Sequence, residues 1–233
     1  MKRETFVVGD VHGCFNTLLD LVNKLPKEAN LIFVGDLCDK GLYTKEVIEF
    51  IIKNGYRSVL GNHDMHMILN LEDALNGKDS LWNTSSRYYG SATVNSYKGA
   101  SKSLVKEHIS FLKSLPAFIE IDRFLITHGF GLPFYKGRDE KFKLFLMRVN
   151  RINKISYKEF YEDGYESYDI INIFGHISFD EVQVGKNYYA IDTNVKRGNK
   201  LSAISLDTLE IVSTKANNKD LAIYKEELCV STM

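Results

Sequence analysis

Apolar and polar positions follow two alternating periods over the first 76 residues. Three short apolar runs, rich in β-branched residues, have the composition of buried strands: 5–8, 31–34 and 57–60. After each run, apolar residues recur at helical spacing, which predicts three helices: 15–25, 43–53 and 64–76. This order, strand then helix repeated three times, predicts neighbouring parallel strands in one sheet.

The pattern changes after residue 76. Residues 77–103 are dense in Ser, Asn, Tyr and Gly and contain the single tryptophan, Trp82. Such a composition predicts a loop-rich lid or helical cap rather than core. A helix is predicted at 102–114, so the lid insertion covers about 77–115.

The second half of the chain is rich in strand candidates, and regular helical crossovers do not separate them. They lie at 117–121, 124–127, 170–174, 187–191, 201–206 and 209–213. This crowding predicts a second, partly antiparallel sheet. The polar segment 153–169 is expected to be a surface connection. No linker interrupts the sequence, so we expect one α/β domain over residues 1–233.

Each of the three N-terminal apolar runs ends in a Gly-polar motif. The motifs are GDVHG (9–13), GDLCDKG (35–41) and GNHD (61–64), and their second residues, Asp10, Asp36 and Asn62, are 26 residues apart. Because parallel strands end at the same edge of a sheet, these side chains are expected to meet there. Carboxylate and amide oxygens gathered at one edge predict a metal centre.

Histidines extend this set of metal-capable residues. His12 lies two residues after Asp10, and residues i and i+2 of an extended chain point the same way. His128 follows the strand candidate at 124–127, and His176 follows the one at 170–174. Imidazole mixed with carboxylate and amide oxygen suits Mn, Fe or Zn better than Mg or Ca. We therefore expect two divalent metal ions as cofactors.

Two such ions about 3.5–4 Å apart would hold a phosphoryl group and lower the pKa of a bound water from about 15.7 toward about 7. Hydroxide can then attack phosphorus without a covalent intermediate. His63, adjacent to Asn62, is placed to protonate the leaving oxygen. Asp39 can orient that histidine.

Charged residues near these motifs can hold the phosphate oxygens. Lys40 is one candidate, and an arginine, Arg148 or Arg151, is the other. A surface ion pair is the competing interpretation of Arg148. His66 is interpreted as an ordinary helix-face residue, and His108 as an exposed one.

Composition adds few constraints. Thirty Lys and Arg balance thirty Asp and Glu, which gives no electrostatic argument for binding nucleic acid or a membrane. Cys14 and Cys38 are interpreted as small packing residues, and with Cys229 they make an odd number that suits a reducing compartment. The N-terminus has no apolar signal core, and no apolar window reaches the length of a membrane span. A cytoplasmic location is the expectation.

Five ordered motifs resemble those of the calcineurin-like metallophosphoesterases: GDVHG, GDLCDKG, GNHD, THG (127–129) and GH (175–176). Within that family the chain is most similar to the phosphoprotein phosphatase branch, in particular bacterial serine/threonine phosphatases, and to the symmetrical diadenosine tetraphosphate hydrolases. The resemblance covers about residues 5–206. It implies two mixed β-sheets packed as a central sandwich, flanked by helices, with two metals at its edge.

The resemblance also assigns roles by position. It implies that Asp36 is shared by two metals and that the other ligands are Asp10, His12, Asn62, His128 and His176. His63 becomes the proton donor with Asp39 as its partner, and the segment FLMR favours Arg148 as the phosphate ligand. The expected activity is that of a serine/threonine phosphoprotein phosphatase acting on a phosphorylated protein or a small phosphoester.

Several positions depart from the family pattern. Lys40 stands where arginine is usual, and Asp64 where glutamate is usual. YYG replaces NGG in the lid, HGF replaces HGG, and IDTN replaces IDTG. Lysine keeps the charge of arginine but loses its planar fork. Two alternatives therefore stay open: hydrolysis of diadenosine tetraphosphate or a similar dinucleotide, and a metal- or phosphate-binding scaffold with little turnover.

Overall fold

The computed structural model describes residues 3–151 and 168–221. Its first sheet has five strands, β10 (Ile211–Lys215), β9 (Lys200–Ser205), β1 (Thr5–Val8), β2 (Asn30–Phe33) and β3 (Arg57–Ser58), in that order. β1, β2 and β3 are parallel, as their sequence predicts. β9 is antiparallel to β1 and to β10.

The second sheet also has five strands, β4 (Phe118–Ile121), β5 (Phe124–Thr127), β6 (Ile171–Phe174), β8 (Tyr188–Ala190) and β7 (Gln183–Val184), in that order. Its central pairs are parallel and its two edge pairs antiparallel. The strands near 201–206 and 209–213, expected in this sheet, belong to the first sheet instead. An apolar run predicts a strand but does not specify which neighbour it pairs with.

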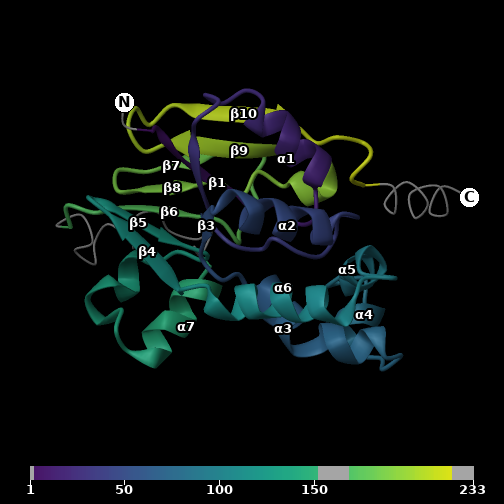
Figure 1. The fold of residues 1–233 in the computed structure, drawn as a ribbon. Helices are drawn as coiled ribbons and strands as arrows, with labels where there is room; N and C mark the ends of the chain where they lie inside the picture. The colour runs from purple at the N-terminus through teal and green to yellow at the C-terminus, as the bar shows by residue number, and fades with distance from the viewer. Residues whose placement is uncertain (1–2, 152–167, 222–233) are drawn as a thin grey trace, which may run out of the picture.

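Helices lie around the two sheets (Figure 1). They are α1 (Phe15–Val22), α2 (Thr44–Asn54), α3 (Asn62–Leu75), α4 (Leu81–Thr84), α5 (Gly90–Ser96), α6 (Lys102–Ser114) and α7 (Lys141–Val149). Two short 3-10 helices, η1 (Leu132–Gly137) and η3 (Val195–Arg197), follow β5 and β8. α2 ends at Gly55, which has a φ of 65°, the left-handed conformation common just after a helix.

The side-chain alternation of β1 and β2 separates two apolar layers. Val7 and Ile32 face the second sheet, where they pack with Ile126 and Ile173. The alternate residues of both strands pack with the helices on the other face: Phe6, Val8, Leu31 and Phe33. The expected sandwich of two mixed sheets flanked by helices is confirmed.

The segment 77–115 is helical and contributes to the core. Trp82 from α4, Tyr97 after α5, and Val105 and Leu112 from α6 belong to the same apolar cluster as α1 and α2. The expectation that residues 77–103 lie outside the core was therefore wrong. Aromatic residues scattered among Ser and Asn are enough to anchor short helices against a large neighbouring surface.

His108 on α6 is buried rather than exposed, which corrects a second expectation. Only 1% of the residue is accessible, and its Nδ1 lies 2.6 Å from the Tyr97 hydroxyl. α6 packs against both α3 and α2. A single amphipathic stripe predicts contact on one face only, so the second contact buries additional residues such as His108. Cys14 and Cys38 are fully buried, as expected of packing residues.

A segment near the C-terminus is joined to the first helix. The Asp220 carboxylate accepts hydrogen bonds from the backbone N–H groups of Asn16 and Thr17 at 3.0 and 2.8 Å, and from both of their side chains. These groups belong to the first turn of α1, whose N–H groups have no partner within the helix. A residue distant in sequence therefore caps α1.

Every helix in the described residues is too short or too polar to cross a bilayer. A cytoplasmic location stays a prediction. Nearly all of the expected surface connection at 153–169, and Cys229, lie outside the described residues.

Candidate metal centre

The three Gly-polar motifs follow the ends of β1, β2 and β3, as the spacing of Asp10, Asp36 and Asn62 predicts. His12 does not reach this edge through an extended chain, because its φ is 47°. A tight left-handed turn brings His12 Nε2 to 3.9 Å from Asp10 Oδ2. The two side chains therefore meet as expected, but for a different reason.

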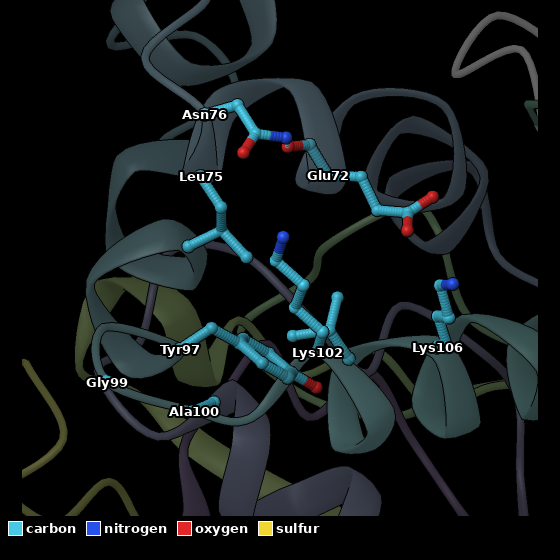
Figure 2. A pocket seen from close by; sticks show the side chains of 9 residues that line it. Glu72, Leu75, Asn76, Tyr97, Gly99, Ala100, Lys102 and Lys106 are labelled. Carbon is cyan, nitrogen blue, oxygen red and sulfur yellow. Dashed lines mark hydrogen bonds between the residues drawn. The ribbon is translucent and has the colours of Figure 1, made fainter.

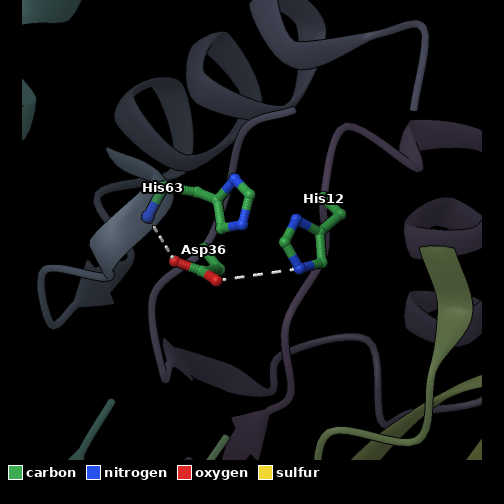
Figure 3. A group of neighbouring side chains, drawn as sticks. All are labelled: His12, Asp36 and His63. Atoms are coloured by element: carbon green, nitrogen blue, oxygen red, sulfur yellow. Dashed lines mark hydrogen bonds and ion pairs between the residues drawn. The ribbon is translucent and has the colours of Figure 1, made fainter. Parts of the chain in front are cut away.

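Two groups of potential ligand atoms share one carboxylate. The first consists of His12, Asp36 and His63, with the ligand atoms all within 4.8 Å of one another. Figure 3 shows the two imidazole rings close to each other and to the Asp36 carboxylate. His12 Nε2 is 3.7 Å from Asp36 Oδ2, and the His63 backbone N–H donates to Asp36 Oδ1 at 2.9 Å.

The second group consists of Asp36, His128 and His176. His128 Nε2 lies 3.3 Å from Asp36 Oδ1, 3.0 Å from Asn62 Oδ1 and 3.2 Å from His176 Nδ1. Asp10 adjoins this group, since the His176 backbone N–H donates to its carboxylate at 3.1 Å. All six residues expected to be metal ligands therefore converge on one edge of the sandwich.

Hydrogen bonds fix the orientation of two imidazole rings. His12 Nδ1 lies 3.0 Å from the Cys38 carbonyl oxygen, and His128 Nδ1 lies 2.8 Å from that of Val34. Because a carbonyl only accepts, each Nδ1 carries the hydrogen, and a neutral ring then has its lone pair on Nε2. Both Nε2 atoms point into the ligand groups. Such backbone-anchored histidines, together with buried carboxylates, fit divalent metal ions.

The charges of the centre are strongly coupled. Burial raises the pKa of Asp10 well above its usual value, and nearby Asp192 adds to that rise. Burial alone would do the same to Asp36, but His128 and His63 hold the pKa of Asp36 well below its usual value. Burial opposes a charge on His128, yet Asp36 raises its pKa to about 9. A carboxylate and an imidazolium thus compensate each other where metal ligands are expected.

His63 and Asp39 form a hydrogen-bonded pair beside the ligands. His63 Nδ1 donates to Asp39 Oδ2 at 2.6 Å, and this bond does not use Nε2. Asp39 is fully buried and also accepts from Trp82 Nε1 at 2.9 Å and from Thr93 Oγ1 at 2.8 Å. Burial lowers the pKa of His63, but Asp36 and Asp39 outweigh it and the pKa is raised.

Asp64 holds the second motif against α3. Its carboxylate accepts from the backbone N–H groups of Asp36, Leu37 and Gly61 at 3.0, 2.9 and 2.9 Å. The residue is fully buried, and burial raises its pKa to about 6. The shorter side chain in place of glutamate therefore still positions Asp36.

A cavity of about 440 Å³ opens beside the ligands. Its lining includes Asp36, Asn62, His63 and His176, and five cationic residues: Lys40, Arg87, Arg151, Lys196 and Arg197. Rings also contribute, because His66 and Tyr88 lie on its wall with their centroids 4.7 Å apart. His66 is thus part of the cavity, where the sequence alone indicated an ordinary helix position.

The expected phosphate ligands are placed differently from one another. Lys40 lines the cavity, donates a hydrogen bond to the Arg87 carbonyl and lies over the ring of Tyr89. Burial lowers its pKa to about 8. Arg148 is not among the lining residues, whereas Arg151 is. The Arg148 Nε atom is buried and has no hydrogen-bond partner within residues 3–151 and 168–221.

Lys196 was not anticipated from the sequence. Its ammonium lies 3.1 Å from His12 Nε2 and 3.2 Å from Asp192 Oδ2. Burial lowers the pKa of Lys196, but Asp192, Asp10 and Asp36 outweigh it and the pKa is raised. The departure from IDTG to IDTN, two residues before Lys196, was the available signal. For Trp82 and Thr93, the only sequence signal was the unusual composition of 77–103, and it was weaker.

A second cavity, of about 400 Å³, lies between α3 and α6 (Figure 2). Glu72 lines it from α3, and Lys102 and Lys106 line it from α6. Its lining shares no residue with the two metal-ligand groups.

Comparison with known proteins agrees with this geometry. Residues 5–206 match the family described as Calcineurin-like phosphoesterase. The serine/threonine-protein phosphatase 2 of Escherichia coli (strain K12) is 29% identical over 210 residues, which are 86% of this chain and 91% of that protein. A symmetrical bis(5'-nucleosyl)-tetraphosphatase of Buchnera aphidicola subsp. Baizongia pistaciae is 40% identical over 81 residues, only 33% of this chain and 29% of that protein.

A solved structure supports the fold. The cold-active protein-tyrosine phosphatase of a psychrophile, Shewanella sp., superimposes with a TM-score of 0.61 over 93% of this chain and 81% of the other, at 16% identity. The match over residues 5–206 shows that this chain belongs to the calcineurin-like phosphoesterase family. It is accordingly a hydrolase of phosphoester bonds, and the family implies divalent metal ions.

Proposed function

We propose that the chain is a serine/threonine phosphoprotein phosphatase that uses two divalent metal ions, Mn first, with Fe or Zn as alternatives. Asp10, His12 and Asp36 hold one ion. The second shares Asp36 and adds three ligands: Asn62, His128 and His176. The observation that carries this proposal is the buried Asp36 carboxylate, whose atoms lie in both groups of potential ligand atoms.

When bound, two divalent ions supply Lewis acidity at phosphorus and lower the pKa of water at the site. The protein supplies the proton for the leaving oxygen. His63 can hold that proton at Nε2, because Nδ1 donates to Asp39 and the raised pKa favours the charged ring. Asp39, held by two further donors, keeps the imidazole in one orientation.

Lys40 and Arg148 are proposed to bind the phosphate oxygens, with Arg151 as the alternative arginine. Lys40 has three N–H donors, and the Arg87 carbonyl accepts one of them. The remaining donors support a contact with a phosphate in the cavity that Lys40 lines. Arg87 and Tyr88, also on the cavity, support the proposal that 77–115 serves as a cap within a single domain of residues 1–233.

Mn²⁺-dependent release of phosphate from a phosphoserine peptide tests the proposal. Asp36→Asn is the matched variant, since it removes one charge without changing the size of the side chain. We expect this variant to lose both ions and its turnover, as measured by metal analysis and phosphate release. An Asp36→Asn protein with two bound ions and full activity would remove Asp36 as the shared ligand. Tight Mn²⁺ binding without turnover of any phosphoester would favour the scaffold alternative.

Hydrolysis of a symmetrical dinucleoside tetraphosphate is the second candidate. It is favoured by the five cationic side chains on one cavity, together with the rings of His66 and Tyr88, which are more than a single phosphoryl group requires. Parallel measurement of kcat/KM with a phosphopeptide and with diadenosine tetraphosphate separates the two. A large preference for the dinucleotide would reverse our order.

A further inference from the structure

The contact between Lys196 and His12 is not explained by an ordinary ion pair. Lys196 is paired with Asp192 four residues earlier, and its side chain is only 18% exposed. Asp192 already accepts from Ser178 Oγ at 2.7 Å and from the Asn194 backbone N–H at 2.9 Å. The Asp192 carboxylate therefore has hydrogen-bond partners besides the Lys196 ammonium. The contact of Lys196 with His12 Nε2 is additional to this ion pair and needs its own explanation.

The lone pair of His12 decides what this contact means. His12 Nδ1 donates to the Cys38 carbonyl, so Nε2 is the accepting nitrogen. Lys196 Nζ lies 3.1 Å from Nε2, and an ammonium can only donate. The lone pair that accepts from Lys196 is thus the same one that a divalent metal ion would need. One lone pair cannot serve both cations.

The second ligand group has no such competitor among the described residues. His128 Nε2 lies within 3.3 Å of atoms of Asp36, Asn62 and His176, and none of these residues is a lysine or an arginine. The two halves of the centre are therefore unequal: a buried lysine ammonium contacts a ligand atom of the first half, whereas Arg151 and Lys196 act on His176 of the second half through their charge.

We propose that Lys196 is a built-in cation that competes with the first metal ion for His12 Nε2. The proposal rests on the proposed function, because it assumes that both halves bind metal. The second half, at His128, then binds its metal ion tightly. The first half, at His12, binds its ion only when the Lys196 ammonium moves away from His12 Nε2. Since Lys196 also lines the cavity, withdrawal leaves its charge where an anionic substrate binds.

Metal titration of Lys196→Met tests this competition. Arg197→Met is the matched control, because Arg197 is the next residue, carries the same charge and lines the same cavity. Isothermal titration with Mn²⁺ alone, together with metal analysis after dialysis, should give the wild type one tight and one weaker ion. In Lys196→Met we expect the weaker Kd to fall at least tenfold, while Arg197→Met changes it less than twofold.

Equal affinity of two ions in the wild type, or unchanged Kd values in Lys196→Met, would overturn the competition and leave the proposed function standing. A wild type that binds no Mn²⁺ would overturn both. If Lys196→Met does not fold, Lys196→Gln keeps a donor without the charge and should show the same gain in affinity. Lys196→Arg, which keeps the charge, should retain the weak first ion.

Discussion

At the scale of single residues, the candidate site concentrates unusual backbone conformations. Nine non-glycine residues have positive φ among those described, and five of them belong to the site: His12, Asp36, Asp39, Lys40 and His176. A left-handed conformation costs an L-residue about 1–2 kcal/mol. The surrounding contacts hold these residues in place, so their side chains reach positions that a regular strand end would not give them.

His63→Ala tests the proton donor. We expect metal content to stay unchanged and turnover of an alkyl phosphate to fall by about 10²–10⁴-fold, the usual contribution of a positioned acid. An aryl phosphate, whose leaving group needs less help from a proton, should lose much less. Phosphate-release kinetics and metal analysis check both points. Loss of bound metal would instead make His63 a ligand, as its place in the first group of ligand atoms also allows.

His128 predicts a pH dependence of metal binding. Asp36 raises the pKa of His128 to about 9, so at pH 7 the ring carries a proton that a metal must displace. Metal affinity should therefore rise with pH up to about 9, by about tenfold per unit for one proton. Titration at pH 7 in buffers of different ionisation enthalpy should detect the released proton. Heats that do not depend on the buffer would contradict this.

At the scale of elements, α4 and α5 determine how the His63–Asp39 pair is held. Trp82 from α4 and Thr93 from α5 both donate to the Asp39 carboxylate. Thr93 Oγ1 also accepts from the Asp39 backbone N–H at 2.9 Å. These two helices are therefore part of the site, because they fix Asp39, the hydrogen-bond partner of the proposed proton donor His63.

Thr93→Val removes these hydrogen bonds while keeping the shape of the side chain. Because Asp39 then loses an orienting donor, we expect kcat to fall by about 10–100-fold, as for other partners that orient site residues. Metal content should not change. Thr84→Val, at an exposed position of α4, is the control and should retain wild-type kcat. Equal kcat in wild type and Thr93→Val would show that Asp39 needs no such support.

The elements and the parallel pairing of the first three strands were predictable, but the sheet to which the last two strands belong was not. The runs TFVV and LIFV specify strands because successive apolar residues alternate between two buried faces. The proposed metal ligands could be selected from the sequence because each lies shortly after a strand and next to a glycine. Lys196 and Asp192 escaped notice, since nothing local indicates that they meet His12. The same applies to His108, whose burial depends on two helices that pack against α6.

At the scale of the whole molecule, Asp220 joins the two ends of the described chain. Asp220→Ala should lower the free energy of unfolding by about 1–3 kcal/mol, because buried N–H groups at the start of α1 lose their acceptor. Urea denaturation measures this change. Lys219→Ala alters an exposed neighbour and should change stability by less than about 0.5 kcal/mol. Equal stability of both variants would show that water replaces the carboxylate.

The pairing of β1 has a consequence for synthesis in the cell. Val7 is bonded on one side to the strand of Ile32 and on the other to the strand of Ile204. During translation, one edge of β1 therefore has no strand to pair with until β9 has left the ribosome. An apolar strand with an open edge can pair with other chains, and distant pairing is slow. The protein should thus aggregate most readily during its own translation, before β9 has been synthesised.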